Sequence, residues 1–181
     1  MALSSLSIGS PAMSQDTFDD VVSTDWTRST YSVPVTDKAN IDVEHVTAQK
    51  LDADGNPLAG SLGFACASGK LFVMLSYEDV DMDSAIKAAW SESNAKPTAG
   101  RLTIDGETSR RSGYTDMRDS QVFTIMTPGD RRSLYNGVIR GQDMSFKVSR
   151  KQHTIHVPSV NTDFREFGAE CGLGTLSRSE G

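Results

Sequence analysis

Short segments in which apolar and polar residues alternate recur along this chain, and they constrain its fold more than any other feature. Ile41, Val43, Val46 and Ala48 give an imperfect alternation of this kind, which is typical of a strand with one buried face. Further segments are rich in apolar residues and have the usual length of strands: 58–67, 70–77, 101–105, 121–127, 144–148 and 153–157. The pattern predicts a β-rich α+β fold built as an antiparallel β-sandwich.

Turn and helix signals divide these segments. The Asp54–Gly55 step indicates a tight turn because both residues tolerate positive φ, and Ser68–Gly69 indicates a hairpin between its two neighbouring strands. Apolar residues at helical spacing are confined to short stretches. We expect helices over 84–90 with Asp83 as N-cap, over 131–138 after Pro128, and over 164–171 with Thr162 or Asp163 as N-cap.

A length of 181 residues fits one domain. Residues 1–20 are expected to be either the remnant of an export signal or a flexible arm. Pro11-Ala-Met-Ser14 looks like the small-residue end of a signal, but no Lys or Arg precedes it. We expect a single β-rich domain over 21–173 and a disordered tail over 174–181. No run approaches the roughly 20 apolar residues that cross a bilayer, so no membrane span is expected.

Charge is divided unevenly between the two halves of the chain. The net charge is -6; residues 1–90 carry 5 basic and 13 acidic side chains, whereas residues 91–181 carry 13 basic and 11 acidic ones. Nucleic-acid binders usually have the opposite overall sign, with basic residues gathered on one face. The acidic composition therefore argues against a polyanionic partner such as nucleic acid, although it is compatible with a local basic patch in the second half of the chain.

The only two cysteines, Cys66 and Cys171, are far apart in the sequence, and each lies in an apolar stretch. Neither belongs to a C-x-x-C motif or stands beside a histidine at metal-ligand spacing, so zinc and thioredoxin-type interpretations have no support. Two alternatives follow from the residues: one long-range disulfide, which implies an oxidising compartment, or two buried free thiols.

Candidate metal ligands have structural explanations that fit better. Asp79, Asp81 and Asp83 alternate like the first ligands of a calcium loop, but Ser84 and Trp90 stand where such a loop needs Gly and a bidentate Glu. An acidic turn that leads into a helix N-terminus explains them better. His153 and His156 are three residues apart on an expected strand, which points their rings to opposite faces. We expect neither a metal site nor a cofactor.

Two pairs of adjacent arginines are the candidate binding residues. Arg110, Arg111, Arg131 and Arg132 would form an anion-binding or acid-binding face, because guanidinium groups pair bidentately with carboxylates; simple solvation of these side chains is the alternative. The sequence has neither a G-x-S-x-G nucleophile elbow nor a phosphate-binding P-loop. We therefore expect a protein that is not an enzyme.

Several stretches together resemble a known family. They are Trp26, 32–37, 62–66, 71–73, 101–105, 134–141 and 164–171. In this array the chain resembles small exported bacterial domains, nearest the VasI-like accessory proteins associated with type VI secretion and related uncharacterised periplasmic proteins. The resemblance implies a β-sandwich with short helices, a disulfide between Cys66 and Cys171, and a periplasmic location. No catalytic residues come with it.

The sequence thus predicts a non-catalytic, exported module that binds another protein or assists assembly, associated with a secretion system. The alternative is a structural protein of a virion or a secretion machine, in which the N-terminal residues form an arm that reaches a neighbouring subunit. A small periplasmic hydrolase is a third class, but it needs a convergent site that the sequence does not show.

Overall fold

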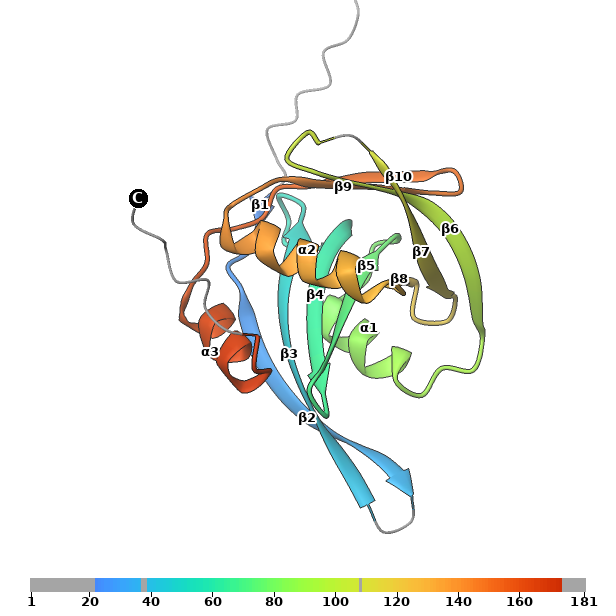
Figure 1. Cartoon of the computed structure of the whole chain (residues 1–181), viewed down its shortest axis with the longest axis vertical. Helices are drawn as coiled ribbons and strands as arrows, with labels where there is room; N and C mark the ends of the chain where they lie inside the picture. Colours follow the sequence, from blue (N-terminus) through green and yellow to red (C-terminus); the bar gives the residue numbers. More distant parts are fainter. Residues whose placement is uncertain (1–21, 37–38, 108, 174–181) are drawn as a thin grey trace, which may run out of the picture.

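The computed structural model describes residues 22–36, 39–107 and 109–173. In this part of the chain, ten strands form one antiparallel sheet and three helices pack on it (Figure 1). The strands are β1 (Val22–Ser23), β2 (Thr27–Thr36), β3 (Ala39–Leu51), β4 (Pro57–Ala67), β5 (Lys70–Ser76), β6 (Ala95–Ile104), β7 (Arg110–Met117), β8 (Val122–Ile125), β9 (Met144–Val148) and β10 (Lys151–Ile155). The helices are α1 (Met82–Ala89), α2 (Pro128–Ile139) and α3 (Thr162–Glu170).

The fold is β-rich as predicted, but the expected two-sheet sandwich is replaced by a single sheet. Its strand order is β1-β3-β4-β5-β8-β7-β6-β9-β10, with β2 paired to β3 outside this path. The sheet curls until β10 lies against β4, where the His153 side chain covers Gly60. Alternation along a strand predicts one buried face, but it does not determine whether a sheet splits in two or curls on itself.

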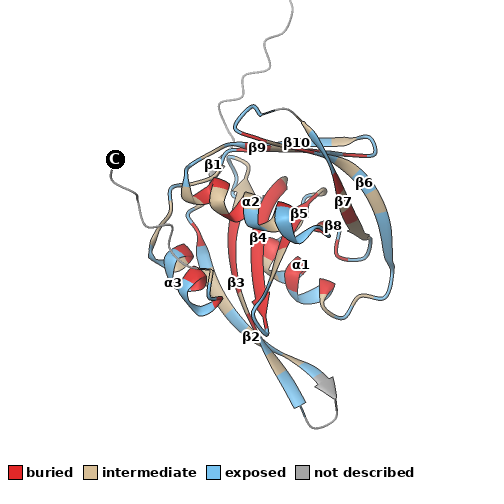
Figure 2. Ribbon diagram, in the orientation of Figure 1, coloured by how far each residue is buried: buried red, intermediate tan, exposed pale blue. Residues whose placement is uncertain are grey.

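The central strand β4 is buried on both sides. Leu62, Phe64 and Cys66 point into the larger core, on the concave side of the sheet, whereas Ala65 and Ala67 face α1. Figure 2 shows this buried centre, with exposed residues concentrated at the rim and on the outer strands. Burial on both faces explains why residues 58–67 form an almost continuous apolar run.

An aromatic cluster fills the larger core. The Phe164 ring on α3 lies 4.6 Å from Trp26, 5.6 Å from Phe64 and 5.2 Å from Tyr135, measured between ring centroids. All four side chains are buried. The cluster therefore joins the start of β2, the central strand and the last two helices.

The helices form where the sequence predicts them, but two of their caps differ. Asp81 caps α1 by accepting a hydrogen bond from the Ser84 amide (2.8 Å), whereas the expected cap, Asp83, lies inside the first turn. Asn161 caps α3 through the Phe164 amide (3.1 Å), in place of Thr162 or Asp163. Both caps are the Asx residues expected at this position, one or two places earlier than predicted.

Within the described residues, no helix is long and apolar enough to cross a membrane.

Truncating the central ring of the cluster should destabilise the domain strongly. Phe164→Ala is expected to lower the free energy of unfolding by about 3–5 kcal/mol, because the lost burial adds to the cost of the cavity. Urea unfolding followed by fluorescence of the buried Trp26 measures the change. Arg165→Ala is the matched control, because Arg165 is the exposed next residue of the same helix; equal effects of the two changes would contradict this packing.

Candidate partner-binding surface

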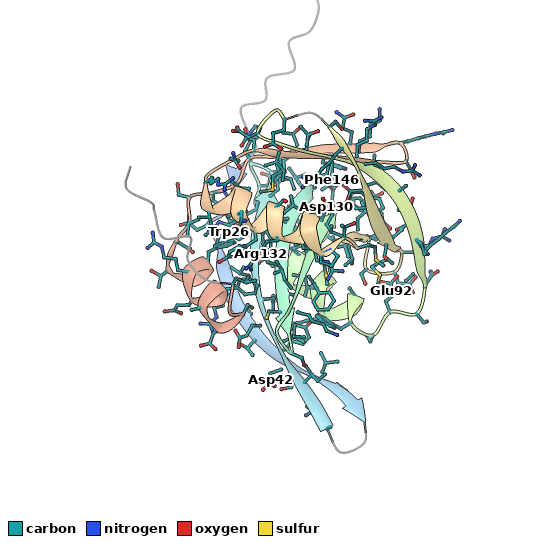
Figure 3. The ribbon with its side chains drawn as sticks, in the orientation of Figure 1. Trp26, Asp42, Glu92, Asp130, Arg132 and Phe146 are labelled. Atoms are coloured by element: carbon teal, nitrogen blue, oxygen red, sulfur yellow. The ribbon has the colours of Figure 1, made fainter. Side chains whose placement is uncertain are left out.

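The structure gives the four predicted arginines different surroundings. Arg131 is half-buried and Arg110 is ion-paired, whereas Arg111 and Arg132 are exposed and make no ion pair with a described residue. Figure 3 shows Arg132 and Asp130 along α2, over the concave side of the sheet, while Arg111 belongs to β7. The pairs therefore do not form one continuous basic face.

Arg131 fastens α2 to the sheet. Its Nε and Nη2 donate hydrogen bonds to the carbonyl oxygens of Ile125 (2.6 Å) and Met126 (2.9 Å). Its Nη1 donates to the Leu71 carbonyl (2.9 Å), and the guanidinium carbon lies 5.2 Å from the centroid of the Phe72 ring. Burial lowers the pKa of Arg131 from its ordinary value. Arg131 is therefore a structural residue of the fold, and the predicted binding role does not fit its half-buried position.

Arg110 belongs to a small polar network at the start of α2. Its Nη2 lies 3.1 Å from Oδ1 of Asp130, and the other carboxylate oxygen accepts a hydrogen bond from the Ser112 hydroxyl (2.6 Å). Asp130 is buried and stands in the first turn of the helix, where negative charge is favourable. Arg110 thus compensates a buried carboxylate, although its own side chain is 43 % exposed.

Arg111 lies at one end of a row of cations that crosses the outer face of the sheet. In the strand register Arg111 pairs with Arg101 of β6, and Arg101 pairs with Lys147 of β9. Residues opposite each other in neighbouring strands share a face of the sheet, and all three side chains are exposed. We call Arg111, Arg101 and Lys147 the cationic row.

The side chains of the cationic row are not neutralised by any residue that the structure describes. No carboxylate in the described ranges forms an ion pair with any of its three members, and the only side-chain hydrogen bond found for them there runs from Arg101 to the Ser109 carbonyl (3.3 Å). Like charges opposite each other in a sheet are destabilising. The three cations line an open hollow of about 450 Å³ together with Ala99, Gly100 and Ser149.

Gly100 keeps the strands of this surface close together. A side chain here would meet the backbone carbonyl of Lys147 at 2.5 Å and the Tyr114 ring at 2.8 Å. The absence of a side chain therefore lets β6 lie tightly between β7 and β9. The three cations therefore project from closely packed strands and not from a loop.

The two cysteines are neighbours in space. Cys66 near the end of β4 and Cys171 at the C-terminus of α3 are both buried, and both are free thiols. Burial raises the pKa of the Cys171 thiol, and the adjacent Cys66 thiol raises it further. The structure therefore has the proximity that the implied disulfide requires but not the bond; in this state the thiols pack as small apolar groups.

The acidic turn before α1 is used inside the protein. Asp79 accepts from the Ala59 amide (2.8 Å), Asp81 caps the helix, and Asp83 bonds to His45 and to Lys87 (2.5 Å). Burial of Asp83 opposes ionisation, but these hydrogen bonds outweigh it and lower the pKa of its carboxyl. Each carboxylate thus has a structural partner.

The two histidines of the expected strand do not meet. The His153 ring stacks on Phe146 at 5.3 Å between centroids, whereas His156 Nδ1 lies 2.9 Å from Oδ2 of Asp143. Among the described residues there is no group of three or more His, Cys, Asp or Glu side chains arranged to hold a metal ion.

Sequence reasoning missed Arg101, Lys147 and His45. The first two are single basic residues in different strands, and only the register brings them beside Arg111. His45 is fully buried on β3 against α1. It was missed because the alternation of apolar and polar residues in this segment gave no sign that a histidine would be buried. A prediction of strand pairing would have found the cationic row, because the three residues become neighbours once β7, β6 and β9 are aligned.

No protein-family model, curated protein or solved structure matches this chain.

The adjacent residues Arg131 and Arg132 give a matched test of the different roles found here. Arg131→Ala should lower the free energy of unfolding by about 1–3 kcal/mol, because it removes charge-assisted hydrogen bonds to three carbonyl groups. Arg132→Ala should change it by less than about 0.5 kcal/mol, as is usual for an exposed side chain. Urea unfolding measures both, and similar losses in the two variants would contradict the role assigned to Arg131.

Proposed function

We propose that this protein is a non-catalytic, exported module that binds another protein or assists its assembly, with the cationic row as the central part of its binding surface. The observation that carries the proposal is that three cations lie side by side on the sheet and make no ion pair with any residue that the structure describes. Repulsion between neighbouring like charges lowers the stability of a folded protein. Residues that lower stability in this way are common at functional sites.

The resemblance to type VI secretion accessory proteins supports export to the periplasm. The adjacent cysteines agree with this, since disulfides persist in oxidising compartments. We propose that Cys66 and Cys171 become oxidised there: two thiols form one disulfide, and a thiol oxidant such as a disulfide-exchange protein accepts the two electrons and two protons. Because both sulfur atoms are buried in the folded protein, the oxidant forms a mixed disulfide with one cysteine before α3 docks, and docking then brings the second thiol to displace it.

A structural protein of a virion or secretion machine is the second candidate, and one feature favours it. The β2–β3 hairpin projects from the body of the domain, with Asp42 on its polar face (Figures 1 and 3). The opposite face carries Val33 and Ile41, which pair across the hairpin and are only half-buried. Such an extension suits contact with a neighbouring subunit. The N-terminal arm of this hypothesis lies outside the described residues.

Reversing the central charge of the cationic row should separate binding from stability. Arg101→Glu places a carboxylate between Arg111 and Lys147, so we expect the free energy of unfolding to rise by about 0.2–1 kcal/mol. The same change should abolish recovery of a specific partner when the tagged protein is isolated from its native cells and the bound proteins are quantified by mass spectrometry.

Arg165→Glu is the control, because it makes the same charge change at an exposed site on α3. The proposal fails if no protein is enriched by the wild type, or if Arg101→Glu and the control retain it equally. Turnover of an ester, peptide or glycoside that one point mutation abolishes would show an enzyme instead.

The redox state of the cysteines tests the proposed compartment. In protein made by the native host, alkylation under denaturing, non-reducing conditions should label neither Cys66 nor Cys171. A disulfide that closes a loop of about 100 residues stabilises by up to about 4.7 kcal/mol, so reduction should lower the melting temperature by several degrees, and Cys171→Ser should be insensitive to reductant. Labelling of both cysteines would show that the bond is absent and would remove the main support for export.

A further inference from the structure

We propose that the cationic row is a receptor for an acidic polypeptide segment, in which closely spaced Asp or Glu carboxylates bind Arg111, Arg101 and Lys147. This inference rests on the proposed function and specifies the chemistry of its partner. The two arginines provide planar, bidentate donors for carboxylates, and the lysine provides a third positive charge.

The geometry of the row fits a polypeptide. Neighbouring strands of a sheet lie about 4.8 Å apart, so the backbone positions of the three cations span about 10 Å, a distance that about three residues of an extended chain cover. Small residues beside them leave the hollow of about 450 Å³ open above the sheet.

Hydroxyl groups next to the cationic row provide neutral hydrogen-bond donors on the same surface. Thr103 of β6 pairs with Ser145 of β9, two positions along each strand from Arg101 and Lys147, and Ser145 pairs with Thr154 of β10. These hydroxyl groups lie on the same face as the cations. They can form hydrogen bonds to the main chain of a bound segment, whose charged side chains contact the row.

The charge of the whole molecule favours a protein segment over an extended polyanion. The chain has a net charge of -6, so a membrane of anionic lipids or a nucleic-acid duplex would face the rest of an acidic surface as well as the row. Charges act over about 8–10 Å in physiological salt. A short acidic segment contacts the row and avoids most of this repulsion.

Binding of a labelled oligo-glutamate peptide, followed by fluorescence anisotropy, tests the proposal directly. The wild type should bind the peptide with an affinity that falls as salt is raised. Arg101→Glu and Lys147→Glu should each weaken binding about tenfold or more, because charge-assisted hydrogen bonds are replaced by repulsion. Arg165→Glu should bind nearly as the wild type, and melting curves verify that every variant is folded.

Parallel measurements use a DNA duplex and vesicles that contain phosphatidylserine. Weaker binding of both than of oligo-glutamate supports the proposal, whereas tighter binding of either overturns it. Failure of the wild type to bind oligo-glutamate, or an equal loss in Arg165→Glu, also overturns it. If Arg101→Glu loses the native partner but the wild type does not bind oligo-glutamate, the proposed function stands and only the acidic nature of the partner is refuted. If Arg101→Glu keeps the native partner and the wild type does not bind oligo-glutamate, both proposals are refuted.

Discussion

The packing of Phe164 against Trp26, Phe64 and Tyr135 is the interaction on which the rest of this fold depends. It brings the start of β2, the middle of the sheet and the last two helices into one core. Asn161 reinforces it, because its side chain donates to the Trp26 carbonyl (2.7 Å) while its oxygen caps α3. The same docking of α3 places Cys171 beside Cys66, so the proximity of the thiols follows from aromatic packing and does not need a covalent bond.

Residues of the core and residues of the candidate surface lie on opposite faces of the same strands. Leu102 of β6 and Phe146 of β9 are buried and pair with each other, while Arg101 and Lys147, one position away, are exposed and also pair. Since side chains alternate between the faces of a sheet, burial of the apolar residues fixes the register and, with it, the spacing of the cations. The backbone positions of the surface cations are thus fixed by the same packing that forms the core.

Much of the fold could be predicted from local patterns, but the surface could not. The β4–β5 hairpin was predicted because Ser68–Gly69 separates two apolar runs, and both residues do adopt positive φ. Strand β7 was missed because its sequence, Arg110 to Met117, is mostly polar and its inward side includes Ser112. Without β7, Arg111 is not placed beside Arg101, so the row was not visible. The four arginines were selected from the sequence as adjacent pairs, yet sequence alone could not distinguish Arg131, which holds a helix against the sheet, from Arg111, which faces solvent.

The contact between Asn161 and Trp26 spans 135 residues, and this separation has a consequence for biosynthesis. Translation proceeds from the N-terminus, so the tryptophan leaves the ribosome long before the helix that covers it. Contacts of such long range also slow folding, because the chain between them must be ordered first. The core therefore stays incomplete until nearly all of the domain has been made, and through that interval the newly made chain exposes apolar surface on which a chaperone can act.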